Sequence, residues 1–358
     1  METSSSRLPD LQTLTAGLNS VLNGDGSGGG PVLLLDREPN DYASGWASEI
    51  VTCRLSDGTE LRLFFKYGSD RIGATNGNFN TEPLSDVGYE AEVYRVVLQP
   101  LHGPTPKFYG TYKEEATGRS WLIVEYIEDA MVLHQMAAAE KMVPVWRAWR
   151  QMDDMWEQWE QWELNTMGMA ASWIGRFHAV SEVRLSDITN QFLKKYDSDY
   201  YLEQARRTLL FSNNSSQDFR WLHTLCEQFQ KSVAPLLRGR PTIVHGDYYS
   251  HNILVRNDRI CPLDWELSGI DLGEMDLACL TEGWAPETAR HCELEYQRAR
   301  WPGGAPADFE QVLGAARLCL YFYNLGHQPQ WASQSECVWY SEQLQAIGEQ
   351  MGLMEVNE

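Results

Sequence analysis

The chain has 358 residues, of which 43% are hydrophobic and 22% are charged, and its formal net charge is −21. This length suits a two-lobed enzyme, and the composition is that of a soluble globular protein. The acidity argues against nucleic acid and anionic membranes as partners, although it also serves plain solubility or would suit a cationic substrate. No apolar run is long enough to span a membrane.

The first residues, METSSSRLPD, have neither the basic nor the apolar region of a signal peptide, so we expect none. No C-x-x-C pair occurs and the number of cysteines is odd, which predicts buried, reduced thiols in a cytoplasmic protein rather than a disulfide frame or a zinc site. The cysteines concerned are Cys53, Cys226, Cys261, Cys279, Cys292, Cys319 and Cys337.

Residues 1–30 are polar and are interpreted as a flexible N-terminal segment. They contain a formal G-x-G-x-x-G at Gly24, Gly26 and Gly29. A dinucleotide-binding fingerprint needs a strand before it and a helix after it, whereas here an apolar run follows directly. We therefore interpret the glycines as part of a connector.

A series of strand-like runs follows, broken by one helix. Asp57-Gly58 predicts a tight hairpin turn, a Gly/Asn-rich loop occupies 68–88, and a helix begins near Tyr89. The expected strands are 31–36, 49–55, 61–67, 107–113 and 120–127.

After residue 127 the pattern is helical, except for short apolar runs at 242–266. Strands first and helices second predict an α+β fold, with a small sheet lobe at 31–127 and a helical lobe at 128–358. A tryptophan stripe in the helical part packs against the core, lines a substrate wall or forms a dimer seam. Its members are Trp146, Trp149, Trp156, Trp159 and Trp162.

One stretch, TIVHGDYYSHNILVRNDRICPLDWE, carries the chemistry. His245, Asp247 and Asn252 form H-x-D-x-x-x-x-N, and a predicted hairpin then returns the chain to Asp264. Oxygen-bearing side chains gathered at one point suit Mg²⁺ together with phosphate oxygens. Asn252 and Asp264 are therefore candidate metal ligands, and Asp247 is the candidate base that orients an acceptor hydroxyl.

This stretch resembles the catalytic loop of the protein-kinase-like fold, and HGD with DWE resembles the aminoglycoside phosphotransferase and choline kinase group of small-molecule kinases. Protein kinases usually carry D-F-G at Asp264 and a lysine at Tyr249. Both departures favour a small-molecule acceptor over a protein. The resemblance extends in order from about residue 31 to 285 and implies a bilobal fold with an antiparallel-sheet N-lobe and a helical C-lobe.

The resemblance also implies the nucleotide site. Lys66 grips the α- and β-phosphates, and Glu90 pairs with it. Glu92 is the rival for that pairing, on another face of the helix. Backbone groups near Glu125 and Ile127 bind adenine.

The same resemblance implies that Asp276 is a structural anchor for the catalytic loop. We interpret His245 as structural, with its ring bonded to backbone near the loop. His251 is a candidate substrate contact, and Glu266 is a candidate contact for a second metal or for a substrate amine; the residues leave both roles open. A single-glycine loop offers N–H groups to phosphate. Its residues are Ser44, Gly45 and Ser48.

We therefore expect a kinase that moves the γ-phosphate of ATP or GTP, with Mg²⁺, to a hydroxyl of a small molecule such as an aminoglycoside, another antibiotic or a secondary metabolite. Two alternatives remain open. One is a kinase of a primary metabolite such as choline, homoserine or methylthioribose. The other is a non-catalytic nucleotide-binding module.

Overall fold

The computed structural model describes residues 8–23, 30–40, 46–68, 86–101, 105–133, 153–185, 192–213, 219–334 and 337–355. Within 153–185, side chains are described from residue 161 onward. The chain forms two compact units. The first is Met1–Ala130 with Leu263–Leu267, and the second is Met131–Pro262 with Ser268–Glu358. The assignment of nucleotide to the N-lobe and of acceptor to the C-lobe stays a prediction.

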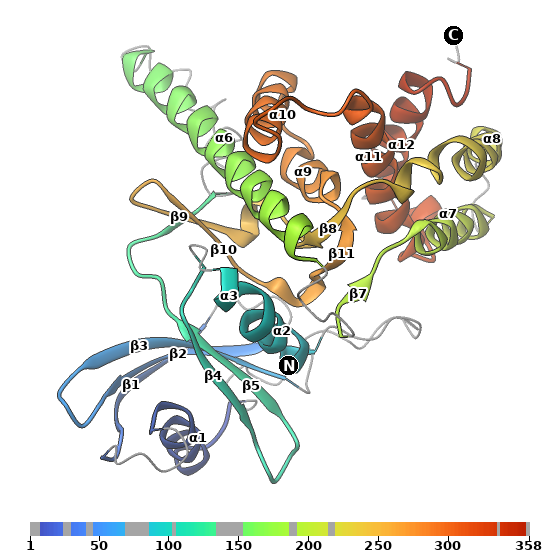
Figure 1. Cartoon of the computed structure of the whole chain (residues 1–358). Coiled ribbons are helices and arrows are strands. Elements are labelled where there is room, and N and C mark those ends of the chain that lie inside the picture. The colour runs from blue at the N-terminus through green and yellow to red at the C-terminus, as the bar shows by residue number, and fades with distance from the viewer. Residues whose placement is uncertain are drawn as a thin grey trace. The chain divides into compact units, whose positions relative to one another are not determined.

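The first unit is built on a five-stranded antiparallel sheet in the order β1-β2-β3-β5-β4 (Figure 1). Its strands are β1 (Leu33–Pro39), β2 (Ala47–Arg54), β3 (Glu60–Tyr67), β4 (Phe108–Lys113) and β5 (Ser120–Glu125). Its helices are α1 (Leu11–Asn23), α2 (Val87–Val93), the π-helix η2 (Tyr94–Leu98), α3 (Gln99–Leu101) and the 3₁₀ turn η6 (Trp265–Leu267).

Period-two alternation decides what each face of this sheet carries. Leu63, Phe65 and Tyr67 of β3 join the apolar core cluster. Lys66 stands at the intervening position and therefore faces the other side, where it contacts α2. Gly58 takes φ of 89° in the β2–β3 turn, as the Asp-Gly sequence predicts.

The segment expected to be flexible, residues 1–30, contains helix α1, which sequence analysis did not predict. Leu14 and Leu18, one helical turn apart, are fully buried in the core cluster of the sheet. A Cβ on Gly17 would lie 2.4 Å from the Trp121 ring, so glycine allows the close approach. Burial of this apolar stripe against the sheet stabilises the helix, although the rest of its surface is polar.

The second unit is mainly helical. Its α-helices are α6 (Asp153–Arg184), α7 (Ser198–Ser212), α8 (Arg220–Gln228), α9 (Glu274–Thr281), α10 (Pro286–Arg300), α11 (Phe309–Gly326) and α12 (Val338–Gln350). Shorter turns are η3 (Phe229–Val233), η4 (Leu236–Arg238), η5 (Ser250–Asn252) and η7 (Trp331–Ser333). None of the described helices is long and apolar enough to cross a membrane.

Two small sheets lie among these helices, in the orders β10-β9-β6 and β7-β11-β8. Their strands are β6 (Met131–Val132), β7 (Lys194–Lys195), β8 (Pro241–Val244), β9 (Ile253–Arg256), β10 (Arg259–Pro262) and β11 (Gly269–Leu272). The predicted hairpin is confirmed: β9 pairs with β10, and Asn257 and Asp258 turn with φ of 46° and 59°. The α+β prediction is confirmed as well.

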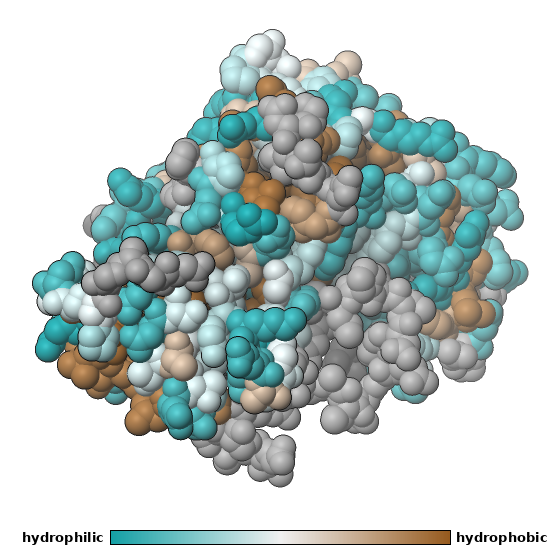
Figure 2. Space-filling model, turned by 60° about the horizontal axis from the view of Figure 1, so that its bottom comes forward, coloured by the Kyte–Doolittle hydropathy of each residue, from teal (hydrophilic) through white to brown (hydrophobic). Residues whose placement is uncertain are grey.

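The tryptophan stripe is only partly covered by the described residues. Trp146 and Trp149 lie outside them, and Trp156, Trp159 and Trp162 lie on α6, where Trp162 is half-buried. Hydrophilic residues cover most of the surface visible in Figure 2, and hydrophobic residues form separate patches on it.

Candidate active site

Lys66 lies at the centre of an acidic cluster in the first unit. It sits on β3, is only 8% exposed, and its Nζ donates to Glu90 Oε2 at 2.7 Å and to Asp264 Oδ1 at 2.6 Å. Glu266 Oε2 lies 3.6 Å from the same nitrogen. One buried cation therefore neutralises part of the charge of three carboxylates.

Glu90, rather than Glu92, is the partner of Lys66. Asp86 caps the N-terminus of α2 by accepting a bond from the Gly88 N–H, which sets the helix face that carries Glu90. Glu90 is buried, and its second oxygen accepts a bond from the Trp265 N–H at 3.1 Å. Glu92 instead binds Arg95 on the surface.

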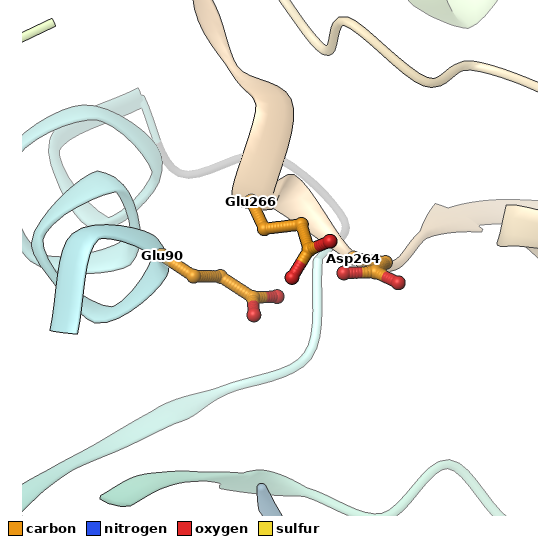
Figure 3. Close-up of side chains that lie close together, drawn as sticks. All are labelled: Glu90, Asp264 and Glu266. Atoms are coloured by element: carbon orange, nitrogen blue, oxygen red, sulfur yellow. The ribbon is translucent and has the colours of Figure 1, made fainter. Parts of the chain in front are cut away.

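Figure 3 shows Glu90 on α2 and Asp264 and Glu266 on the neighbouring segment, with the three carboxylates directed toward one another. Each offers an oxygen within 4.8 Å of the others. The Trp46 indole N–H donates to Glu266 Oε2 at 2.6 Å and fixes that side chain. An all-oxygen donor set of this kind fits a hard divalent cation that also binds phosphate oxygens.

Burial and charge act in opposite directions on this cluster. Burial alone would lower the pKa of Lys66, but the attraction of Glu90, Asp264 and Glu266 outweighs it and raises that pKa. Burial raises the pKa of Glu90, against the attraction of Lys66. Lys66 therefore stays charged, while the acids around it compete for its single positive charge.

Asp264 adopts a left-handed backbone conformation with φ of 61°. Aspartate tolerates this region better than bulkier residues, but the conformation still costs energy. The strained residue directs its carboxylate to Lys66. Backbone strain at a residue that meets a buried cation is typical of a functional site.

The loop that carries Asp247 belongs to the second unit. Gly246 takes φ of 84°, a conformation that turns the chain sharply just before Asp247. Asn252 Nδ2 donates to the Asp247 carboxylate at 2.7 Å and to its backbone oxygen at 3.0 Å. The Tyr249 N–H donates to the same backbone oxygen at 2.8 Å. Asp247 is thus fixed by neutral donors.

The loop is anchored from beneath by Asp276 at the start of α9. Its Oδ2 accepts the His245 N–H at 2.7 Å, and its Oδ1 accepts the Gly246 N–H at 2.9 Å. The fully buried His245 ring accepts a bond from the Asp247 N–H through Nδ1 at 3.2 Å. His178 Nε2 meets the Asp276 carboxylate at 3.0 Å.

The remaining predicted site residues make other contacts, each within its own unit. Ser48 is buried in β2, and its hydroxyl accepts a bond from Asn40 Nδ2 at 3.1 Å, while Ser44 and Gly45 lie outside the described residues. The Glu125 N–H is bonded to Lys107 O at 2.8 Å. Ile127 follows β5, outside any strand.

His251 is exposed on η5, and its ring stacks on Tyr249 with 5.5 Å between centroids.

Several groups of the two units were not singled out from sequence. The first is Trp46, whose only sequence signal is its place in the loop before β2. The second is Glu282, which the Tyr249 hydroxyl reaches and whose Oε1 is buried with no hydrogen-bond partner among the described residues. The third is the pair Tyr296 and Arg300 of α10, which has no motif at all.

The model of the phosphotransferase enzyme family, APH, matches residues 81–309. The chain belongs to this family. A search of curated proteins found no match. Family membership supports a small-molecule phosphotransferase, and the predicted resemblance is confirmed.

Solved structures share the fold of this family member. A protein from Ralstonia eutropha JMP134, whose name as an aminoglycoside phosphotransferase is provisional, matches with a TM-score of 0.57 and 17% identity over 96% of this chain and 97% of its own. APH(2″)-IIa in its ternary complex with streptomycin and ATP matches with a TM-score of 0.54 and 14% identity over 96% and 99%.

The choline kinase LicA from Streptococcus pneumoniae matches with a TM-score of 0.52 and 12% identity, again over 96% of this chain and 99% of its own. These matches confirm the predicted kinase-like fold.

Proposed function

We propose that this phosphotransferase moves the γ-phosphate of ATP or GTP to a hydroxyl group of a small organic molecule. The observation that carries the proposal is the fixed carboxylate of Asp247, which Asn252 holds at 2.7 Å at the end of a glycine turn. A carboxylate placed in this way orients an acceptor hydroxyl and takes up its proton late in the transfer.

The nucleotide is proposed to bind at Lys66 and the residues around it. Lys66 donates to phosphate oxygens, and its ion pair with Glu90 fixes the direction of its side chain. Asp264 gives up its contact with Lys66 and binds the metal instead. Phosphate-loop contacts are proposed for the backbone near Ser44, Gly45 and Ser48. Ile127 is the proposed backbone contact for adenine, because the Glu125 N–H is already used within the sheet.

Asn252 and Asp264 are proposed to hold Mg²⁺, with Glu266 as a further oxygen ligand. The oxygen-only donor chemistry fits this ion. When bound, Mg²⁺ neutralises charge on the transferred phosphate. The acceptor oxygen forms a bond to the γ-phosphorus, the bond from that phosphorus to the bridging oxygen breaks, and the acceptor proton passes to Asp247.

The acceptor is proposed to carry a cationic amine, as an aminoglycoside or an amino alcohol does. Glu282 supports this, because its buried Oε1 has no hydrogen-bond partner among the described residues, and Tyr249 links it to the Asp247 loop. Burial and, to a smaller extent, the nearby charge of Glu282 raise the pKa values of Tyr321 and Tyr340. Aromatic rings around a carboxylate favour an organic ammonium group.

An acceptor screen tests the proposal. The wild-type protein is incubated with ATP and Mg²⁺ and with pools of aminoglycosides, amino alcohols and sugars, and products are read by mass spectrometry for one added phosphate. We expect at least one phosphorylated acceptor. We also expect that Asp247→Ala loses transfer by about 100- to 10,000-fold, the range of a general base, while nucleotide still binds.

Two outcomes would count against the proposal. Nucleotide binding without product across all pools would favour the non-catalytic module. Full turnover of Asp247→Ala would remove Asp247 from its proposed role.

A further inference from the structure

A chain of hydrogen bonds runs from α10 through α6 to the loop that carries Asp247, and all of it lies in the second unit. Its members beyond Asp276 are His178 of α6 and Tyr296 and Arg300 of α10. His178 and Tyr296 are fully buried, and Arg300 is 3% exposed. The chain of bonds has a direction that the chemistry of its groups dictates.

Arg300 starts the chain because a guanidinium only donates. Its Nη1 donates to Tyr296 Oη at 2.6 Å and to Glu274 Oε2 at 3.2 Å, and its Nη2 donates to Glu182 Oε2 at 3.1 Å. Since Tyr296 Oη accepts from Arg300, its own hydrogen must go elsewhere. The acceptor within reach is His178 Nδ1 at 3.0 Å.

The tyrosine therefore donates to the histidine, and the histidine donates to Asp276. Burial raises the pKa of Tyr296, so its hydroxyl keeps its hydrogen. Burial lowers the pKa of His178, so its ring is neutral and carries one hydrogen. That hydrogen lies on Nε2, because the Asp276 carboxylate at 3.0 Å only accepts.

We propose that Tyr296 and Arg300 are positioning residues for the loop that carries Asp247. They hold the His178 ring in one orientation, so that Asp276 binds the His245 and Gly246 amides. The Asp276 carboxylate accepts three bonds, from His178 and from those two amides. Rotation of the His178 ring would remove one bond and free the carboxylate to turn. The link to catalysis rests on the proposed function, whereas the bond chain does not.

Close packing leaves little room for another arrangement. A Cβ on Gly273, just ahead of α9, would lie 2.5 Å from His178 Nδ1 and 2.6 Å from both Arg300 Nη1 and Tyr296 Oη. Glycine at this position therefore lets the three polar groups meet. The bonds and the packing point to a single ring orientation.

The wild-type protein provides the first test. In ¹⁵N spectra of the histidine rings without ligand, His178 is expected to be neutral between pH 6 and 8. Its hydrogen should lie on Nε2, and its Nδ1 should be unprotonated and accept a hydrogen bond. An imidazolium signal or a protonated Nδ1 would overturn the proposal, whatever the protein catalyses.

The variant Tyr296→Phe provides the second test, because it keeps the ring that packs on Trp301 and Phe309 but removes the hydroxyl. We expect at least tenfold faster hydrogen exchange at the His245 and Gly246 amides. On an accepting substrate we expect kcat to fall about tenfold with the nucleotide KM within twofold.

The matched control is Tyr201→Phe, which removes another buried hydroxyl of the second unit, one that donates to Asp271. It should leave exchange at His245 and Gly246, and kcat, within twofold of wild type. Equal effects of the two variants would reduce Tyr296 to general packing and sink the proposal. Altered exchange with unchanged kcat would keep the bond chain and refute its catalytic role.

Discussion

The two units hold their acidic side chains by different means. In the first unit Glu90, Asp264 and Glu266 share one cation, Lys66. In the second unit the amide side chain of Asn252 donates to Asp247. The loop just before Asp247 is held by its own backbone N–H groups, which donate to the Asp276 carboxylate. Ion pairs exchange readily when a competing cation arrives, whereas neutral bonds to the backbone fix a geometry in advance.

This difference suits the two tasks proposed above. A group that must receive a charged nucleotide and its metal benefits from exchangeable partners. A group that must aim at one hydroxyl benefits from fixed ones, because misplacement of the reacting groups is costly in rate. Variants that change the charge in the first unit should therefore act on nucleotide binding, and variants that loosen the loop in the second should act on kcat.

Among variants of the first unit, the largest effect is expected from Lys66→Met. It leaves three carboxylates without their shared cation and removes the proposed phosphate ligand, so kcat/KM should fall by about 100- to 1,000-fold, as for loss of one electrostatic donor. Steady-state kinetics with varied nucleotide measure it. Lys113→Met, at an exposed end of β4 in the same sheet, is the control and should change little. Equal rates for the two variants would contradict the role of Lys66.

A smaller effect is expected from Glu90→Gln, which keeps the size of the side chain but removes its charge. Lys66 then turns toward Asp264, and the loss of a buried charged hydrogen bond should lower the free energy of unfolding by about 1–3 kcal/mol. Glu92→Gln, which disturbs only a surface pair with Arg95, should change it by less than about 0.5 kcal/mol. Thermal unfolding of both variants decides whether the two glutamates differ.

The loop of the second unit is tested by Gly246→Ala. A side chain at φ of 84° is strained, at a cost of about 1–2 kcal/mol. We expect kcat to fall about 5- to 30-fold, the equivalent of that energy, with nucleotide KM unchanged. Gly58→Ala has similar strain, with φ of 89° in a remote turn. It should lose stability but keep kcat, and a parallel loss of kcat would show that strain alone explains the result.

The smallest effect concerns pH and the acceptor. Burial raises the pKa of Glu282 to about 7, against its bond from Tyr249. Because this folded pKa lies above the ordinary value, the group favours the folded state below pH 4.5 and loses that contribution as pH rises toward 7. Binding of a cationic acceptor goes the opposite way, since it needs the carboxylate.

The KM for an amine-bearing acceptor should therefore fall roughly tenfold from pH 6 to pH 8, following the ionised fraction of Glu282. Kinetics at fixed saturating nucleotide measure it. Glu282→Gln should flatten the profile. A profile that stays the same in this variant would assign the pH dependence to another group.

Much of the fold and part of the candidate site could be predicted from sequence, because their signals are local. Lys66 ends an apolar strand, Glu90 opens a helix, and Asp247 and Asn252 share one short loop. Hairpins at Asp57-Gly58 and Asn257-Asp258 follow from turn chemistry.

The rest depends on contacts between distant segments. Helix α1 was missed because its polar composition hides the turn-spaced pair Leu14 and Leu18, whose burial needs the sheet. Trp46 meets Glu266 across 220 positions of the chain, and His178 meets Tyr296 across 118. No pattern of spacing marks such pairs before the chain folds.

The most direct measurement concerns the ion that Asn252 and Asp264 are proposed to share. Mn²⁺ replaces Mg²⁺, and its affinity for the protein–nucleotide complex is measured by electron paramagnetic resonance in wild type, Asn252→Ala, Asp264→Ala and the double variant. If both residues hold one ion, each single change should weaken binding at least tenfold, and the double change should cost clearly less than the sum of the two. Strictly additive losses, or no loss in either single variant, would contradict a shared ion and with it the proposed phosphotransfer site.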